Sequence, residues 1–505
     1  MNVSTWCPLV DAFHYRDLDA ISFILSRSRD QDIRDCIEAK NIFGSNLLHV
    51  ATNNKVSGLA RLMVLILRKR IEDKENTKML LNSLGLDWRN DDDDDTIKSS
   101  YVRASSVVSY MNEEKNVKEL LLELRRLFGS RSMSTFTDEL DGHGFSAFHI
   151  ACRDGRVDVM EMLRHIGSAN INRTDLFGRT CLDLIRLMSD AMGDTTRRKV
   201  LKYLNVTSLN IGDSSSNVGY DTTCSNNYNH DNNNNTGGWR PPSETTMTWL
   251  RNILDTASHI DVISASNLNR TTFLRDFVSL RRPVLLKNVN IGESSTWTRE
   301  SMLGHLGDEI VMASIKPYES LHGGNSRDSA PTTLRKHILK KQQHDELAEV
   351  LNNTETLLPR YVFEPSFVAR NKNVLSSSST QHTMLNLESP PRLFDFPVIL
   401  RQFYIGTAFT GSHFHFHNNP AVNVLVYGVK LWLLVPPFEA FYSALHPIEE
   451  MRDMVLSRNI SSFCPHCRVV VQHSSQVVFV PDQWGHLVLN LADCVGLATE
   501  FSPVL

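Results

Sequence analysis

The sequence predicts a multidomain chain, with an all-α repeat solenoid followed by a β-rich barrel that has a helical lead-in. Its length of 505 residues exceeds the usual size of a domain built around a single hydrophobic core. A glycine-containing phrase recurs in the N-terminal third, whereas short alternating apolar runs crowd the C-terminal part. Between them, over residues 206–245, the composition collapses to Asn, Ser, Asp and Gly, which predicts a linker.

The recurring phrase places a histidine five residues after a glycine. Gly44 precedes His49, and Gly144 precedes His149 within a second apolar-His-apolar-Ala stretch. A third start follows at Gly178, 34 residues after Gly144. This period and this phrase resemble ankyrin repeats, which implies helix–turn–helix units that bury their apolar faces by stacking on their neighbours.

We assign residues 1–205 to this ankyrin-type domain. Residues 9–42 are expected to form a degenerate first unit. Helical patterns near 56–71 and 113–128 follow, without a clean repeat between them. Residues 86–108 combine an acidic run with a serine-rich stretch, which predicts a disordered insertion in the solenoid.

Residues 246–505 carry the pattern of the β-rich domain. The expected strands are 284–286, 309–314, 398–405, 414–417, 422–427, 430–435, 468–471, 477–480, 487–491 and 495–501. The expected helices are 246–257, 269–280, 299–306 and 334–351. Helices that precede many short strands fit a barrel with a helical lead-in.

Three histidines are the first candidates for chemistry. His415 and His417 lie one residue apart on an expected strand and should point to the same face, and His486 opens a later strand. A β-barrel builds a facial Fe(II) site with open positions from such a pair and a distant histidine. The pairing of His413 with His415 stays open, because all three alternate histidines share that face.

The pattern resembles the JmjC-type, cupin-fold 2-oxoglutarate oxygenases over residues 246–505. The resemblance rests on Asn423 seven residues before Lys430, on the Lys-x-Trp and Pro-Pro that follow, and on the Val-Pro-x-x-Trp-x-His turn at 480–486. Residues 277–289 look like the strand that opens these domains. The resemblance implies a double-stranded β-helix.

The resemblance also implies the roles of individual residues. The implied Fe(II) ligands are His415, His417 and His486. The implied contacts of 2-oxoglutarate are Lys430, Asn423, Ser412 and Tyr404. Lys430 would pair with the distal carboxylate, since a buried ammonium is costly without an anion. His417 departs from the family, which usually has Asp or Glu there, so this site would carry one negative charge fewer.

Plainer interpretations compete with these assignments. The alternating histidines could be satisfied imidazoles of a half-buried strand, and Lys430 a solvated lysine in a turn. Cys464 and Cys467 form half of a zinc site, which His473 or Cys494 would complete only by an accident of the fold. We expect two ordinary thiols in a loop.

The function that the resemblance implies is Fe(II)- and 2-oxoglutarate-dependent hydroxylation of a protein side chain, with the ankyrin repeats recruiting a protein partner. A catalytically inactive cupin-like scaffold is the alternative, favoured by His417, and histone lysine demethylation is a further one. A net charge of −4 gives no electrostatic signal for nucleic acid. The chain shows neither a long apolar run nor a secretory N-terminus, which predicts a cytoplasmic or nuclear protein without a membrane partner.

Overall fold

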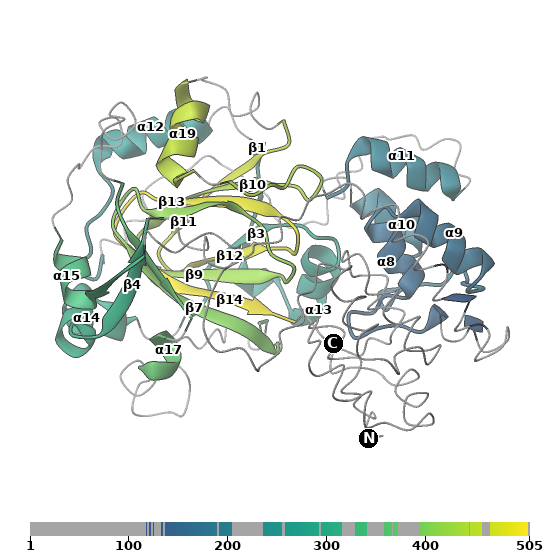
Figure 1. Ribbon diagram of the computed structural model, residues 1–505, viewed down its shortest axis with the longest axis horizontal. Coiled ribbons are helices and arrows are strands. Elements are labelled where there is room, and N and C mark those ends of the chain that lie inside the picture. The colour runs from purple at the N-terminus through teal and green to yellow at the C-terminus, as the bar shows by residue number, and fades with distance from the viewer. Residues whose placement is uncertain are drawn as a thin grey trace, which may run out of the picture. The chain divides into compact units, whose positions relative to one another are not determined.

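The computed structural model describes residues 137–188, 191–204, 236–254, 258–291, 294–315, 329–340, 358–365, 367–371, 393–394, 396–443, 445–456 and 465–502, with a few single positions between 118 and 134. The chain divides into two compact units, residues 1–212 with 504–505, and residues 213–503 (Figure 1). The predicted first repeat unit, the phrase at Gly44 and His49, and the predicted insertion at 86–108 lie outside the described residues.

The described part of the first unit consists of two consecutive helix pairs. Their members are α8 (Ala147–Arg153), α9 (Val157–His165), α10 (Cys181–Leu187) and α11 (Asp194–Tyr203). α8 packs on α9 and α10, and α11 packs on α9 and α10, so the second pair stacks on the first. The buried side chains between them include Phe148, Val159, Leu163 and Leu184. A longer solenoid stays a prediction.

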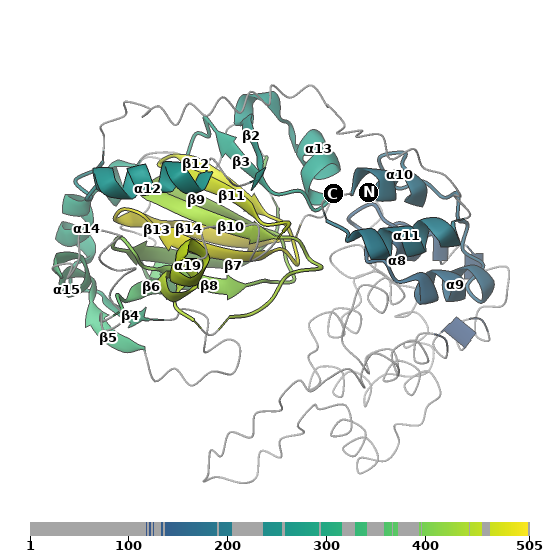
Figure 2. The same ribbon diagram turned by 90° about the horizontal axis from the view of Figure 1, so that it is seen from above.

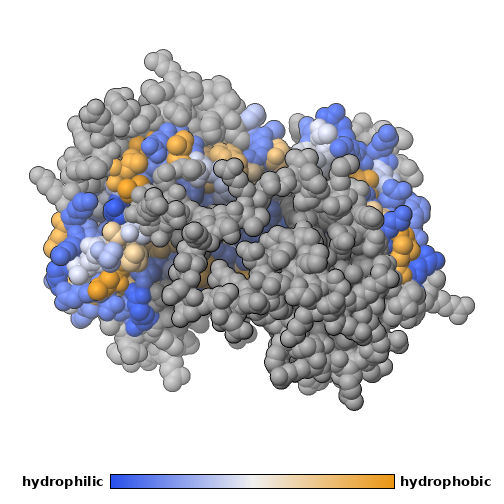
Figure 3. Space-filling model, viewed as in Figure 1, coloured by the Kyte–Doolittle hydropathy of each residue, from blue (hydrophilic) through white to orange (hydrophobic). Residues whose placement is uncertain are grey.

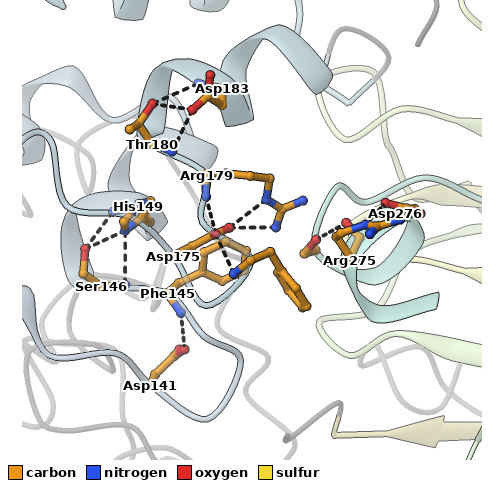
Figure 4. A network of polar contacts seen from close by, with 12 residues as sticks. Asp141, Phe145, Ser146, His149, Asp175, Arg179, Thr180, Asp183, Arg275 and Asp276 are labelled. Carbon is orange, nitrogen blue, oxygen red and sulfur yellow. Dashed lines mark hydrogen bonds and ion pairs between the residues drawn. The ribbon is translucent and has the colours of Figure 1, made fainter. Parts of the chain in front are cut away.

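The same hydrogen-bond pattern, made by an aspartate, occurs in the turn before each helix pair (Figure 4). Asp175 Oδ1 accepts hydrogen bonds from the backbone N–H groups of Phe177 and Arg179, and its other oxygen pairs with the Arg179 guanidinium. Asp141 Oδ1 accepts from two backbone N–H groups at the same offsets. Gly144 and Gly178, at φ 83° and 77°, occupy the left-handed region that these turns need. The 34-residue sequence period is therefore a structural period.

The second unit contains two stacked β-sheets (Figure 1). The smaller sheet has the order β1 (Ser258–His259), β11 (Arg468–His473), β10 (Val429–Val435), β13 (Gly485–Asn490), β8 (Gly411–His415). The larger sheet has the order β2 (Asp261–Ser264), β3 (Val284–Lys287), β12 (Gln476–Val480), β9 (Ala421–Tyr427), β14 (Cys494–Phe501), β7 (Val398–Gly406), β6 (Tyr361–Glu364), β4 (Ile310–Ser314), β5 (Ala330–Thr333). The unit is thus a β-sandwich of the jelly-roll kind.

Helices surround this sandwich. They are α12 (Glu244–Leu254), α13 (Arg270–Phe273), which continues as a π-turn (Leu274–Val278), α14 (Arg299–Leu306), α15 (Leu334–Leu339), α17 (Phe367–Arg370) and α19 (Pro447–Leu456). α12 and α19 cover the outer face of the smaller sheet, and α14 and α15 lie at the β4 end of the larger one (Figures 1 and 2). The predicted helix 334–351 begins as predicted but ends at Leu339, because Lys340 has left the helical conformation, and residues 341–351 lie outside the described residues.

Strand β10 shows why its sequence is apolar on both faces. Leu431 and Leu433 point outward into a core shared with α12 and α19. Trp432 and Leu434 point inward, into the core between the two sheets. Side chains alternate along a strand, so Lys430 shares the inward face with Trp432. A lysine is thereby placed inside the sandwich.

The end of the predicted linker belongs to the second unit. The Trp239 indole N–H donates to the carbonyl oxygen of Trp297 at 2.9 Å, and the Trp239 side chain is buried. Arg240 makes two side-chain hydrogen bonds to the Asp493 carboxylate. The predicted boundary at 245/246 stays a prediction, and the Asn-rich composition stops before these buried contacts begin.

On the face of the molecule that Figure 3 shows, small apolar areas lie among hydrophilic ones on the described residues. Exposed apolar side chains include Ile310 and Met312 on β4 and Leu339 at the end of α15. Among the described helices, none has the length and apolar content required to span a bilayer.

Candidate metal and cosubstrate site

A cavity between the two sheets gathers most of the predicted site residues. His415, His417, His486, Lys430, Asn423 and Ser412 all line it. The seventh, Tyr404, lies directly behind the wall, where its hydroxyl lies 2.8 Å from Asn423 Oδ1 and from the Val424 carbonyl oxygen. The sequence therefore predicted residues that the fold brings together, although they come from five different strands and a loop.

The two sheets position the histidines through strand pairing. His415 ends β8 and lies directly opposite His486 on β13, with the ring centroids 4.2 Å apart. His417 follows two residues after the end of β8. It therefore lies beyond the strand, whereas the sequence predicted it on the strand. Its ring centroid lies 5.1 Å from that of His486 and 6.4 Å from that of His415.

The alternative pairing, of His413 with His415, stays a prediction. His413 is buried, but it does not line the cavity, whereas Ser412 and His415 do. Its ring centroid lies 5.8 Å from that of His415, which is closer than the 6.4 Å between His415 and His417. A bulge between β8 and β13, at His486 and Val488, interrupts the regular register beside this stretch.

All three cavity histidines present the same tautomer. Nδ1 lies 2.8 Å from the His413 carbonyl oxygen in His415, 2.5 Å from that of Asn419 in His417, and 3.0 Å from that of Trp484 in His486. A carbonyl oxygen only accepts, so each Nδ1 carries the hydrogen and each Nε2 carries the lone pair. Metal-binding histidines are oriented in the same way.

The three imidazoles are suitable metal ligands, but as placed they lie too far apart to coordinate one ion. Imidazole nitrogens bind such ions at about 2.1 Å. Within the described residues, no three His, Cys, Asp or Glu side chains lie close enough to hold an ion as placed. The separation of His415 and His417 is the widest of the three, so these two rings must turn toward each other for a common ion to bind.

Burial keeps two of these rings neutral. Burial, with the neighbouring His417 adding to the effect, lowers the pKa of His486 to about 3. Burial also lowers the pKa of His415 well below its ordinary value, with His486 adding to the effect. Both rings can therefore offer a lone pair at neutral pH without first losing a proton.

Lys430 lies deep in the same cavity and is 1% exposed. Its ammonium lies 3.3 Å from the centroid of the Tyr404 ring and 3.3 Å from the Tyr361 hydroxyl. No carboxylate in the described part of the chain forms an ion pair with it, and burial lowers its pKa to about 7. The interpretation as a solvated turn lysine is excluded. A buried ammonium that contacts aromatic rings and a hydroxyl group attracts an anion.

The wall residues that were not predicted as part of the site include Tyr361, Phe363, Gln402 and Glu500. Tyr361 and Phe363 belong to β6, a strand that the sequence pattern did not indicate. Gln402 lies two residues before Tyr404 on β7 and so shares its face of the strand. Glu500 is a charged residue in a mostly apolar strand. Those two signals were available, but only strand pairing shows that they face the histidines.

The cysteine motif makes no metal site in the described part of the chain. Cys464 lies outside it, and Cys467 is buried in the core under α12 and α19. Cys494 belongs to a different cluster, with Tyr361 and Tyr404. Burial raises the pKa of both Cys467 and Cys494 to about 12, so neither thiol ionises readily.

Comparison with known proteins gives separate results for the two halves. Residues 143–176 match the family model of the ankyrin repeat. The C-terminal half is 25% identical over 275 residues to the bifunctional arginine demethylase and lysyl-hydroxylase psr-1 of Caenorhabditis elegans, which covers 48% of this chain and 62% of the relative. It is 23% identical over 269 residues to JmjC domain-containing protein 8 of Mus musculus, covering 51% and 90%.

A plant relative gives the same picture. Arginine-specific demethylase JMJ22 of Arabidopsis thaliana is 23% identical over 274 residues, covering 51% of this chain and 48% of the relative. The chain thus spans less than two thirds of the length of the worm and plant relatives. These matches show homology to JmjC proteins across the second unit.

Proposed function

We propose that this chain, which carries an ankyrin repeat and a C-terminal half homologous to JmjC-domain proteins, is an Fe(II)- and 2-oxoglutarate-dependent oxygenase that hydroxylates a protein side chain. The names of its relatives support an oxygenase-type enzyme family. One observation carries the proposal: a buried ammonium faces the same cavity as three Nε2-presenting histidines. We further propose that the two sheets form a double-stranded β-helix.

Each predicted residue has a task in this proposal. His415, His417 and His486 would hold Fe(II), which together with 2-oxoglutarate supplies oxygen activation when bound. Lys430 pairs with the distal carboxylate of the cosubstrate, and Asn423 with Ser412 would hydrogen-bond the keto-acid end. Tyr404 keeps both Lys430 and Asn423 in position through its ring and its hydroxyl. The cavity wall excludes bulk water from the reacting centre.

Recruitment of a protein partner by the ankyrin repeats belongs to the same proposal. Repeat stacks present extended surfaces for other proteins. Residues 143–176 carry the match to the family model, and a second, similar helix pair follows them. We also propose a cytoplasmic or nuclear location, as the sequence predicts.

A binding protein without catalysis is the second candidate, and His417 favours it. A third imidazole in place of a carboxylate leaves the metal with one negative charge fewer, which weakens affinity for a divalent cation. Demethylation is a third candidate, since two relatives are named as arginine demethylases. All three candidates use the same cavity, so they differ in turnover and product rather than in site.

Succinate formation tests the proposal directly. The full chain with Fe(II), 2-oxoglutarate and oxygen should release succinate when a panel of candidate peptides is added, and the peptide mass should rise by one oxygen atom. A His417→Asp variant restores the usual carboxylate, and a large gain in turnover would show that His417 had silenced the site. Absence of succinate in both proteins would favour the scaffold. Release of formaldehyde with loss of a methyl group would favour demethylation.

A further inference from the structure

The turn between β12 and β13, residues 481–484, orients His486. The Trp484 carbonyl oxygen accepts the hydrogen bond from His486 Nδ1 at 3.0 Å, so the place of this carbonyl group sets the direction of the ring. Trp484 is buried, and its indole N–H donates to the Arg281 carbonyl oxygen at 2.8 Å. The orientation of His486 therefore depends on Arg281, a residue that lies far from it in the sequence.

Arg281 holds the same turn a second time, through its side chain. Its Nε and Nη2 atoms lie 2.8 Å and 2.6 Å from Asp482 Oδ2. The Arg281 side chain is 5% exposed and that of Asp482 is 17% exposed. Desolvation of the two charges offsets much of their attraction, so a pair this buried adds little net stability. What it does supply is a fixed distance between Arg281 and the 481–484 turn.

The backbone of Arg281 has an unusual conformation. Its φ of 50° lies in the left-handed region, which is unfavourable for a residue with a Cβ atom. The residue follows the π-turn and precedes β3, and its N–H donates to the Val278 carbonyl oxygen at 3.2 Å. Such a conformation persists where surrounding contacts enforce it. Here the carbonyl group and the guanidinium of one residue both contact the 481–484 turn.

The 481–484 turn also contacts His417. The Gln483 backbone N–H donates to the His417 carbonyl oxygen at 2.9 Å, and the Gln483 side chain donates to Asn418 Oδ1 at 2.6 Å. His417 lies beyond the end of β8, so these bonds hold a segment that the pairing of β8 with β13 does not reach. One turn is therefore tied to two of the three cavity histidines, and Arg281 is tied to that turn.

We propose that Arg281 is a positioning residue for the metal site: with Asp482 and Trp484 it fixes the turn that orients His486 and supports His417. Arg281 is not among the residues that line the cavity, so it acts through the turn and not through contact with a ligand. The inference rests on the proposed function, because it assumes that the cavity histidines serve one metal ion. A purely structural ion pair would affect the stability of the sandwich and leave metal affinity unchanged in the folded protein.

Anaerobic titration of the full chain with Co(II) tests this role, because Co(II) accepts imidazole ligands and its visible absorption depends on their geometry. The double variant Arg281→Met with Asp482→Leu removes both charges, so neither one is left buried alone. Arg282→Met is the matched control. It breaks an ion pair of the same 2.6 Å length on the neighbouring residue, whose partner Asp261 belongs to β2 and not to the turn. The unfolding midpoint of each variant is measured alongside.

At temperatures well below these midpoints, Co(II) affinity should fall at least about tenfold in the double variant and keep its wild-type value in Arg282→Met. Asp482→Asn keeps an acceptor oxygen and should show a smaller loss, and this variant decides the question if the double variant does not fold. The proposal is overturned by equal affinity in the wild type and the turn variants, by an equal loss in Arg282→Met, or by absence of Co(II) binding in the wild type.

Succinate formation separates this inference from the proposed function. Loss of Co(II) affinity in the double variant of a chain that forms no succinate would remove the oxygenase and keep the positioning role. Succinate formation by a double variant with wild-type Co(II) affinity would remove the positioning role and keep the oxygenase.

Discussion

Lys430 is the residue whose placement is hardest to explain without a ligand. It is enclosed by Tyr404 and Tyr361, with no carboxylate of the described chain to neutralise it. Burying an ammonium in this way destabilises the fold. The cost is understandable if an anion occupies the inner end of the cavity in the working protein.

Replacing Lys430 by Met tests this directly. The folded-state pKa of about 7 lies below the ordinary value of 10.5, so between these pH values the unfolded chain binds more protons than the folded one. The free energy of unfolding of the wild type should therefore rise with pH over this window, relative to Lys430→Met, by up to about 1.4 kcal/mol per pH unit. Denaturant titrations at several pH values measure the difference. Parallel pH profiles for the two proteins would show that burial does not lower the pKa of Lys430, and unchanged 2-oxoglutarate affinity would show that it is not the anion site.

The sequence predicted the central residues because their spacing is local. His415 and His417 lie two positions apart, and Asn423 and Lys430 sit on adjacent apolar strands, so short-range pattern and resemblance were enough. Glu500 and Gln402 escaped prediction, since they reach the cavity only through the pairing of β14 with β7. A bulge between β8 and β13 goes with Ser412, rather than His413, lining the cavity beside His415, and no alternation pattern shows it.

At the scale of elements, the long apolar strands were predictable and most of the shortest ones were not. Strands β9, β10 and β12 differ from the expected ranges by one residue, because their alternation and flanking turns are clear. Strands β1, β2, β5 and β6 were missed: none has more than four residues, and β5 and β6 both pair with β4. Such short strands depend on their neighbours in the sheet, which a local pattern cannot reveal.

Gly496 illustrates how one strand fixes the site. A Cβ there would collide with the Val424 carbonyl oxygen and the Tyr404 hydroxyl. Gly496→Ala should lower the free energy of unfolding by about 1–3 kcal/mol and weaken 2-oxoglutarate binding, since Tyr404 positions Lys430. Gly304→Ala, in α14 with open space around it, is the matched control and should stabilise the protein by up to about 1 kcal/mol. Equal unfolding midpoints for the two variants would refute the close packing described.

The capping box of α10 gives a test in the first unit. The Thr180 side chain accepts from the Asp183 backbone N–H, and Asp183 accepts from the Thr180 backbone (Figure 4). Thr180→Ala should cost about 1 kcal/mol, observed as a lower unfolding midpoint of the repeat unit. Thr195→Ala, on the exposed first turn of α11, should change it little. A cost in both variants, or in neither, would argue against the cap.

At the scale of the whole molecule, composition indicated two units joined by an Asn-rich tract. The Asn-rich tract marks the connection, yet Trp239 and Arg240 already pack on the sandwich. Composition could not show this, because the two residues are flanked by Gly and Pro and have no periodic pattern. Their partners lie far along the chain, Asp493 being the most distant.

A fragment spanning 236–505 should therefore be more stable than one spanning 246–505. Removing the buried Trp239 and the Arg240–Asp493 pair forfeits about 2 kcal/mol, which lowers the melting temperature of the shorter fragment by about 5 °C. Thermal denaturation of both fragments, with a Trp239→Ala form of the longer one, measures the effect. If the shorter fragment melts at the same temperature, these residues are only a tether.

The central claim is that three imidazole nitrogens from separate parts of the sandwich serve one metal ion, and anaerobic calorimetric titration with Fe(II) tests it most directly. We predict one equivalent bound at micromolar iron by the wild type. The affinity should fall at least tenfold in His486→Ala and stay unchanged in His466→Ala, which alters an exposed histidine outside the cavity. Absence of binding by the wild type, or equal binding by both variants, would contradict the account.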